Sequence, residues 1–79
     1  MLQPAREIDR ARSERVAALT EADLEALRLL GAGSSTAQIA AAMSVSTNTV
    51  RTRIRRIRTK LAAPDREHVL AAARDHGVL

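Results

Sequence analysis

The sequence predicts an all-α fold of four helices behind a charged N-terminal segment. Apolar residues recur three or four positions apart in separate stretches, which is the spacing of one face of a helix. Capping residues stand before these stretches, and glycine or proline follows them. No run of alternating apolar and polar residues predicts a strand. We expect residues 1–18 to be a helical extension or a linker and residues 19–79 to be one domain.

The composition fits one small domain with an aliphatic core. The chain has 79 residues and contains no Cys, Phe, Trp or Tyr, so Leu, Ile, Val, Met and Ala must form the core. Without Cys there is neither a disulfide framework nor a thiolate metal site. No apolar run approaches the roughly 20 residues of a membrane span, and we recognise no signal peptide. We therefore expect a cytoplasmic protein without membrane contact.

Capping residues place the starts of the first two helices. Thr20 with Asp23 three residues later forms an approximate capping box, and Gly31 to Gly33 end the helix that follows. Ser35 with Gln38 forms a second box before a helix of about two turns. These positions predict two short helices that are separated by a glycine-containing turn.

The third and fourth helices are delimited in the same way. Ser46 is a good N-cap for a third helix that covers about residues 47–61. Pro64 follows its end, because the residue before a proline avoids the helical region. Asp65 then caps a fourth helix that runs to about His76 and is closed by Gly77.

The third predicted helix is amphipathic, with a basic outer face. Val50, Ile54, Ile57 and Leu61 are spaced i, i+4, i+7 and i+11, so they form one apolar stripe. Six basic residues occupy alternate and adjacent positions between 51 and 60, and no acidic residue occurs in residues 26–64. Such a local positive patch indicates a polyanionic partner, most often a nucleic acid.

The second and third helices together have the pattern of a helix-turn-helix unit. A short helix, a three-residue turn and a longer helix with a basic outer face are typical of this DNA-reading motif. Arg can pair with guanine, Asn with adenine, and Thr with either donor or acceptor groups on base edges. The outer face carries all three types, including Asn48, Thr52 and Arg55.

Four segments resemble the LuxR-type, or GerE-type, DNA-binding domain. They are LTEADLEALRLL (19–30), GSSTAQIA (33–40), VSTNTVR (45–51) and KL (60–61), and the resemblance covers about residues 19–74. It implies a four-helix domain whose third helix enters the major groove of double-stranded DNA. It also implies that the fourth helix pairs two protomers as a homodimer and that the function is transcriptional regulation.

The resemblance and the helix geometry together assign roles to individual residues. The expected base-reading side chains are Arg51, Thr52, Arg55 and Asn48. The expected phosphate contacts are Ser35, Thr36, Ser46, Thr47, Thr49, Arg53, Arg56, Arg58 and Lys60. The apolar face of the fourth helix supplies the expected dimer interface, Val69, Leu70 and Ala73.

The chain departs from the family pattern at a few positions. The family usually has His where Arg53 stands, Gly-Val where Ala62 and Ala63 stand, Arg-Glu at Ala22 and Asp23, and Glu at Gln38. Arg53 lies beside the apolar stripe, so we expect its aliphatic stem to pack while its guanidinium reaches outward to a phosphate. The changes in the first two helices suggest that an internal ion pair is missing.

Two other classes of function remain open from the residues. A sigma-factor region 4 shares this helical unit and would bind RNA polymerase, which is therefore a candidate partner. A helical interaction module could instead bind RNA, polymerase or an acidic protein through the arginine face. We expect no enzyme activity, cofactor or small-molecule site, and no metal site, since His68 and His76 have no third ligand nearby.

Overall fold

The computed structural model describes residues 14–79, which contain four helices and no strand. The helices are α2 (Glu21–Gly31), α3 (Thr36–Met43), α4 (Thr47–Lys60) and α5 (Arg66–Asp75). A single helical turn at residues 14–17 precedes them. The predicted all-α fold is therefore confirmed for this part of the chain. The expected N-terminal extension or linker lies mostly outside the described residues, in 1–13.

The predicted capping residues begin the helices as expected. Thr20 and Asp23 form a reciprocal capping box, and Ser35 and Gln38 form a second one. Ser46 caps α4 and Asp65 caps α5 through their side chains. A cap of this kind stabilises a helix by about 1 kcal/mol, because it satisfies a backbone N–H group that has no partner within the helix.

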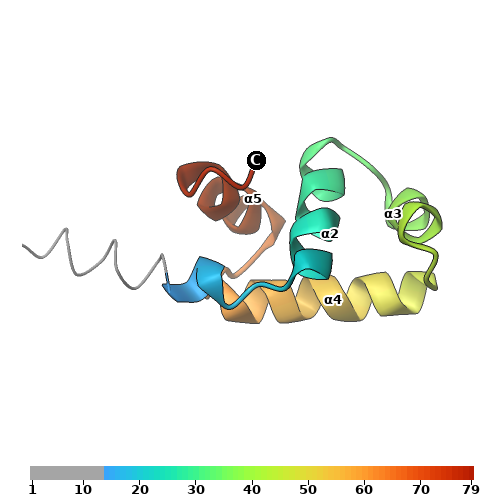
Figure 1. Ribbon diagram of the computed structural model, residues 1–79, viewed down its shortest axis with the longest axis horizontal. Coiled ribbons are helices and arrows are strands. Elements are labelled where there is room, and N and C mark those ends of the chain that lie inside the picture. The colour runs from blue at the N-terminus through green and yellow to red at the C-terminus, as the bar shows by residue number, and fades with distance from the viewer. Residues whose placement is uncertain (1–13) are drawn as a thin grey trace, which may run out of the picture.

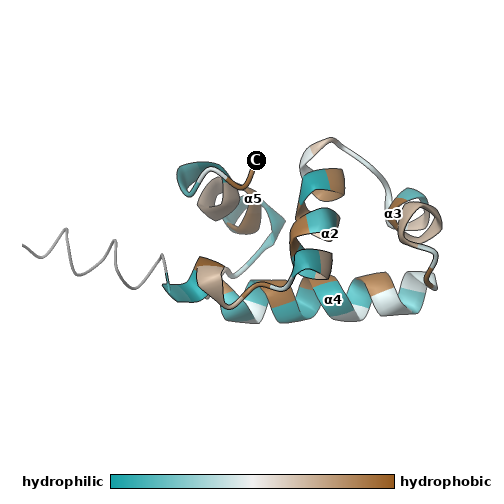
Figure 2. Ribbon diagram, viewed as in Figure 1, coloured by the Kyte–Doolittle hydropathy of each residue, from teal (hydrophilic) through white to brown (hydrophobic). Residues whose placement is uncertain are grey.

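The longest helix, α4, lies along one side of the domain, and α2 and α3 pack on the same side of it (Figure 1). Figure 2 shows apolar residues of α4 on the side that faces α2. Val50 and Ile57 from α4 are fully buried with Leu27 from α2, Ile39 from α3 and Val69 from α5. Every described helix thus contributes side chains to the core. Only one face of α4 is buried there.

Two turns place a non-glycine residue in the left-handed region. Ser44, at the end of α3, has φ 57°, and Ala62, directly after α4, has φ 52°. A Cβ atom in this region approaches the following carbonyl oxygen, which costs roughly 1–2 kcal/mol. The two turns set the crossing of α3 with α4 and the reversal of the chain into α5 (Figure 1). Within residues 14–79, no helix has both the length and the apolar character needed to cross a membrane.

Candidate nucleic-acid interface

The outer face of α4 is a continuous polar and basic surface. Asn48, Arg51, Thr52, Arg55 and Arg56 are all exposed. Within residues 14–79, none of these five side chains makes a hydrogen bond or an ion pair. Asn48, Thr52, Arg55 and Arg56 lie opposite the buried stripe of Val50, Ile57 and Leu61, and Arg51 lies to one side of it. The face that is expected to read base edges is therefore available for an external partner.

The start of α4 presents hydroxyl groups beside these residues. The Oγ of Ser46 accepts the backbone N–H of Thr49 at 3.1 Å and lies 3.0 Å from the Thr49 hydroxyl. Both belong to a shallow hollow of about 400 Å³ on this part of the helix, which is lined by Ser46, Asn48, Thr49, Thr52, Arg53 and Arg56. Helix N-termini attract anions because their backbone N–H groups and dipole both favour negative charge.

The start of α3 is a second helix N-terminus with exposed polar residues. The Oγ of Ser35 accepts the backbone N–H of Gln38 at 3.1 Å, and the Gln38 side chain accepts the Ser35 N–H at 2.8 Å. Ser35 is exposed and Thr36 is half-buried, as is Ser34 before them. The hydroxyl of Ser35 thus already serves the cap, while its exposure leaves it open to a further hydrogen bond with an anion.

One buried carboxylate connects α2 with two basic residues of α4. The side chain of Asp23 is 3% exposed. Its Oδ1 accepts a hydrogen bond from Nη1 of Arg53 at 3.1 Å, and its Oδ2 accepts one from Nζ of Lys60 at 2.8 Å. The backbone N–H of Thr20 also donates to Oδ2, at 3.0 Å. The carboxylate is therefore fully engaged within the domain.

The environment of Asp23 favours its charged form. Burial alone would raise the pKa of this carboxyl. The hydrogen bond from Lys60, the backbone N–H of Thr20 and the positive charge of Lys60 together outweigh burial, so the pKa of Asp23 lies below its ordinary value. Asp23 is hence a carboxylate at neutral pH, with two cations beside it.

The ion pairs correct the predicted orientation of Arg53. The Arg53 guanidinium does not reach outward, because it turns toward Asp23. Lys60, which is also expected to contact a phosphate, bonds the same carboxylate. These ion pairs do not involve positions 22 and 38, where Ala22 and Gln38 carry no charge. The sequence carried a signal for this arrangement. Asp23, Ala26, Leu27 and Leu30 share one buried helical stripe, so an acidic residue stands in an otherwise apolar pattern.

The predicted dimer interface on the fourth helix is corrected at two of its three residues, Val69 and Ala73. Val69 is 0% exposed and Ala73 is 1% exposed, because both pack in the core of their own domain. Leu70 is half-buried and packs against the part of the core that contains Leu30 and Ile39. The apolar stripe of α5 therefore docks the helix on α2 and α4. The outward residues of α5 include Glu67, Ala71 and Arg74.

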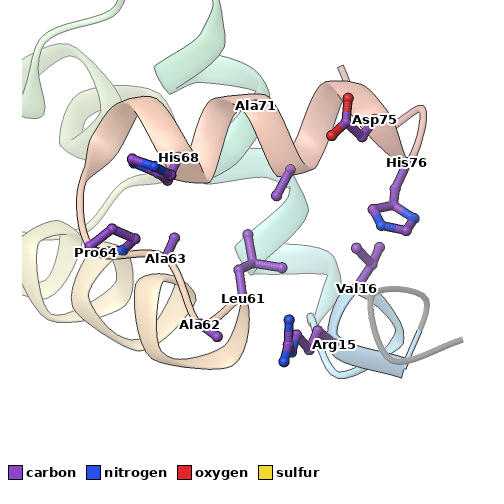
Figure 3. A pocket seen from close by; sticks show the side chains of 11 residues that line it. Arg15, Val16, Leu61, Ala62, Ala63, Pro64, His68, Ala71, Asp75 and His76 are labelled. Atoms are coloured by element: carbon purple, nitrogen blue, oxygen red, sulfur yellow. The ribbon is translucent and has the colours of Figure 1, made fainter. Parts of the chain in front are cut away.

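A separate hollow of about 260 Å³ lies between α5 and the end of α4, away from the start of α4. Figure 3 shows Val16, Leu61 and Ala63 along it, with Arg15 and His76 at one end. Its lining is mostly apolar. No group of three or more His, Cys, Asp or Glu residues that could hold a metal occurs in the described residues.

Comparison with known proteins identifies the family of the chain. A family model described as bacterial regulatory proteins, luxR family, matches residues 17–73, which include all of α2, α3 and α4. No curated protein and no solved structure gives a significant match. The matched region covers well over half of the chain. The chain belongs to the luxR family of bacterial regulatory proteins, a family of DNA-binding regulators of transcription.

Proposed function

We propose that this domain binds double-stranded DNA sequence-specifically, with α4 in the major groove. The observation that carries the proposal is the division of α4 into two faces. Val50 and Ile57 are buried on one face, and the exposed side chains of Asn48, Arg51, Thr52, Arg55 and Arg56 on the other have no partner within residues 14–79. The buried face fixes the helix on the domain, so α4 presents its exposed face in a constant orientation. A major groove about 12 Å wide admits one α-helix with such a face.

Roles within the interface follow from side-chain chemistry and position. Arg51, Thr52 and Arg55, with Asn48 one turn earlier, present the groups that can hydrogen-bond to base edges. Positions near the starts of α3 and α4, together with two arginines farther along α4, suit contacts to phosphate: Ser35, Thr36, Ser46, Thr47, Thr49, Arg56 and Arg58. Phosphate contacts fix the register of a protein on DNA, and base contacts supply its sequence preference.

Selection of bound duplexes from a random pool tests sequence-specific binding directly. We expect a recovered consensus, and we expect Arg55→Ala to weaken binding to it by about 1–3 kcal/mol while relaxing the preference at one base pair. Arg28→Ala is the matched control, because Arg28 is an exposed arginine on α2 rather than on α4. Recovery of no consensus, or equal weakening by Arg55→Ala on every sequence, would contradict base reading by this residue.

We further propose that the domain dimerises on DNA through the outward face of α5. Glu67, Leu70, Ala71 and Arg74 share one side of α5, around a shallow hollow. A second copy related by a two-fold axis near Leu70 and Ala71 would run antiparallel. The Glu67 side chain would then face the Arg74 side chain of the second copy, twice over, as an isologous interface requires.

Charge reversal on α5 tests this pairing. The single variants Glu67→Arg and Arg74→Glu should each weaken cooperative binding to an inverted repeat. The double variant should restore it, since the exchanged charges again face each other. Binding to a single half-site serves as the control and should not change. Additive losses in the double variant would refute the antiparallel pairing while leaving DNA binding by α4 intact.

A further inference from the structure

The six basic side chains of α4 fall into distinct groups in the structure. Arg53 and Lys60 lie two turns apart on the flank that faces α2, and both bond Asp23. Arg58 donates to the backbone carbonyl of Pro64 in the turn after the helix. The exposed side chains of Arg51, Arg55 and Arg56 have no partner within residues 14–79. The formal charge of α4 is therefore larger than the charge it offers to an external anion.

The bonds of Arg53 and Lys60 to Asp23 are protected from solvent on the carboxylate side. The Asp23 side chain is 3% exposed, whereas those of Arg53 and Lys60 are 24% and 31% exposed. The Nε of Arg53 is buried and has no hydrogen-bond partner within the described residues. A phosphate would have to draw these cations from a desolvated carboxylate at 2.8–3.1 Å, and leaving that carboxylate unpaired is unfavourable.

We propose that Asp23 is a specificity-determining residue, because it withdraws Arg53 and Lys60 from the DNA backbone. This inference rests on the proposed function. Contacts to phosphate carry no sequence information, so each additional contact strengthens binding to every duplex alike. Asp23 holds two cations of α4, and its single negative charge offsets one of their two positive charges, so it limits this sequence-independent affinity. The base-reading residues then contribute a larger share of the total binding.

The inference makes a quantitative statement about salt dependence. The logarithm of the association constant falls against the logarithm of salt concentration by about 0.9 for each phosphate neutralised. Replacing a cation that contacts phosphate therefore makes this dependence shallower, and the magnitude of the slope decreases by about 0.9. Replacing a cation that is held by Asp23 leaves the slope unchanged. Releasing both cations makes the dependence steeper, and the magnitude of the slope increases by up to about 1.8, which is two contacts at 0.9 each.

A matched pair of variants tests this prediction. Arg53→Gln and Arg56→Gln remove the same group from positions three residues apart on α4. Their affinity for a mixed-sequence 24-base-pair duplex is measured by fluorescence anisotropy from 50 to 300 mM KCl. We expect Arg56→Gln to lower the slope by about 0.9 and Arg53→Gln to leave it unchanged. An equal decrease in both variants would overturn the role of Asp23.

Asp23→Asn provides the opposite test, because the amide keeps an acceptor for the Thr20 N–H but loses the charge. We expect a slope steeper by up to about 1.8 and an affinity for mixed-sequence duplex that is at least several-fold higher at 100 mM salt. The ratio of specific to non-specific affinity should fall. An unchanged slope in a variant that remains helical by circular dichroism would overturn the proposal.

The outcomes separate this inference from the function on which it rests. A wild-type domain without duplex affinity at 50 mM salt would overturn both. Duplex binding with a selected consensus, together with equal slopes for Arg53→Gln and Arg56→Gln, would overturn only the role of Asp23. If Asp23→Asn does not fold, the two glutamine variants still decide the question, since in Arg53→Gln the carboxylate keeps its bond to Lys60.

Discussion

The left-handed turn after α4 predicts that one substitution will stabilise the domain. Ala62 has φ 52° and is exposed, and Figure 3 places it at the turn that leaves the helix. Glycine has no Cβ, so Ala62→Gly removes a backbone strain of roughly 1–2 kcal/mol. Glycine also has more freedom in the unfolded chain, which costs about 0.4–1 kcal/mol. The midpoints of these two ranges differ by about 0.8 kcal/mol, which is the expected net gain.

Thermal unfolding followed by circular dichroism at 222 nm measures this gain. For a domain of this size, about 1 kcal/mol corresponds to a shift in Tm of roughly 4–8 °C. We therefore expect Ala62→Gly to raise Tm by about 3–6 °C. The control is Ala41→Gly, at an exposed position inside α3, where glycine should lower stability by about 1 kcal/mol. A lower Tm for Ala62→Gly would refute the assignment of strain to this residue.

Three further predictions concern the core, the caps and pH. Val69→Ala should lower the free energy of unfolding by about 2–4 kcal/mol in urea titrations, because Val69 is 0% exposed. A loss below about 0.5 kcal/mol, which is typical of a surface substitution, would contradict its burial. Ser35→Ala should cost about 1 kcal/mol through loss of the cap, and Ser35→Asn, which can also cap, should recover most of it. The pKa of Asp23 is lowered, so its contribution to stability is complete above the ordinary carboxyl pKa of 3.8 and is lost as pH falls through the lower pKa of the folded state. Urea titrations from pH 6 to 2 should therefore show a steeper acid loss in the wild type than in Asp23→Asn, and parallel curves would refute the assignment.

The local features of the fold were predictable because they depend on neighbours in sequence. Each predicted cap involves residues three positions apart, and the apolar stripe of α4 repeats within a single helix. The residues of α4 that do not belong to this stripe must form its outer face. Its geometry could be read from the sequence without knowledge of how the helices pack.

The ion pairs of Asp23 were not predictable in the same way. Asp23 is 30 residues from Arg53 and 37 residues from Lys60 in sequence, and only the crossing of α2 over α4 brings them together. Periodicity also shows that α5 has an apolar face but does not show what covers it. The pattern predicts a dimer interface at Val69 and Ala73, whereas the domain's own core buries both residues.

The shared use of one carboxylate has a consequence for motion within the domain. Asp23 accepts the Thr20 N–H that starts α2, and it also holds Arg53 and Lys60 of α4. Fraying of the first turn of α2 and release of the two cations are consequently linked events rather than independent ones. The positive charge that α4 exposes at any moment therefore depends on whether the first turn of α2 is intact.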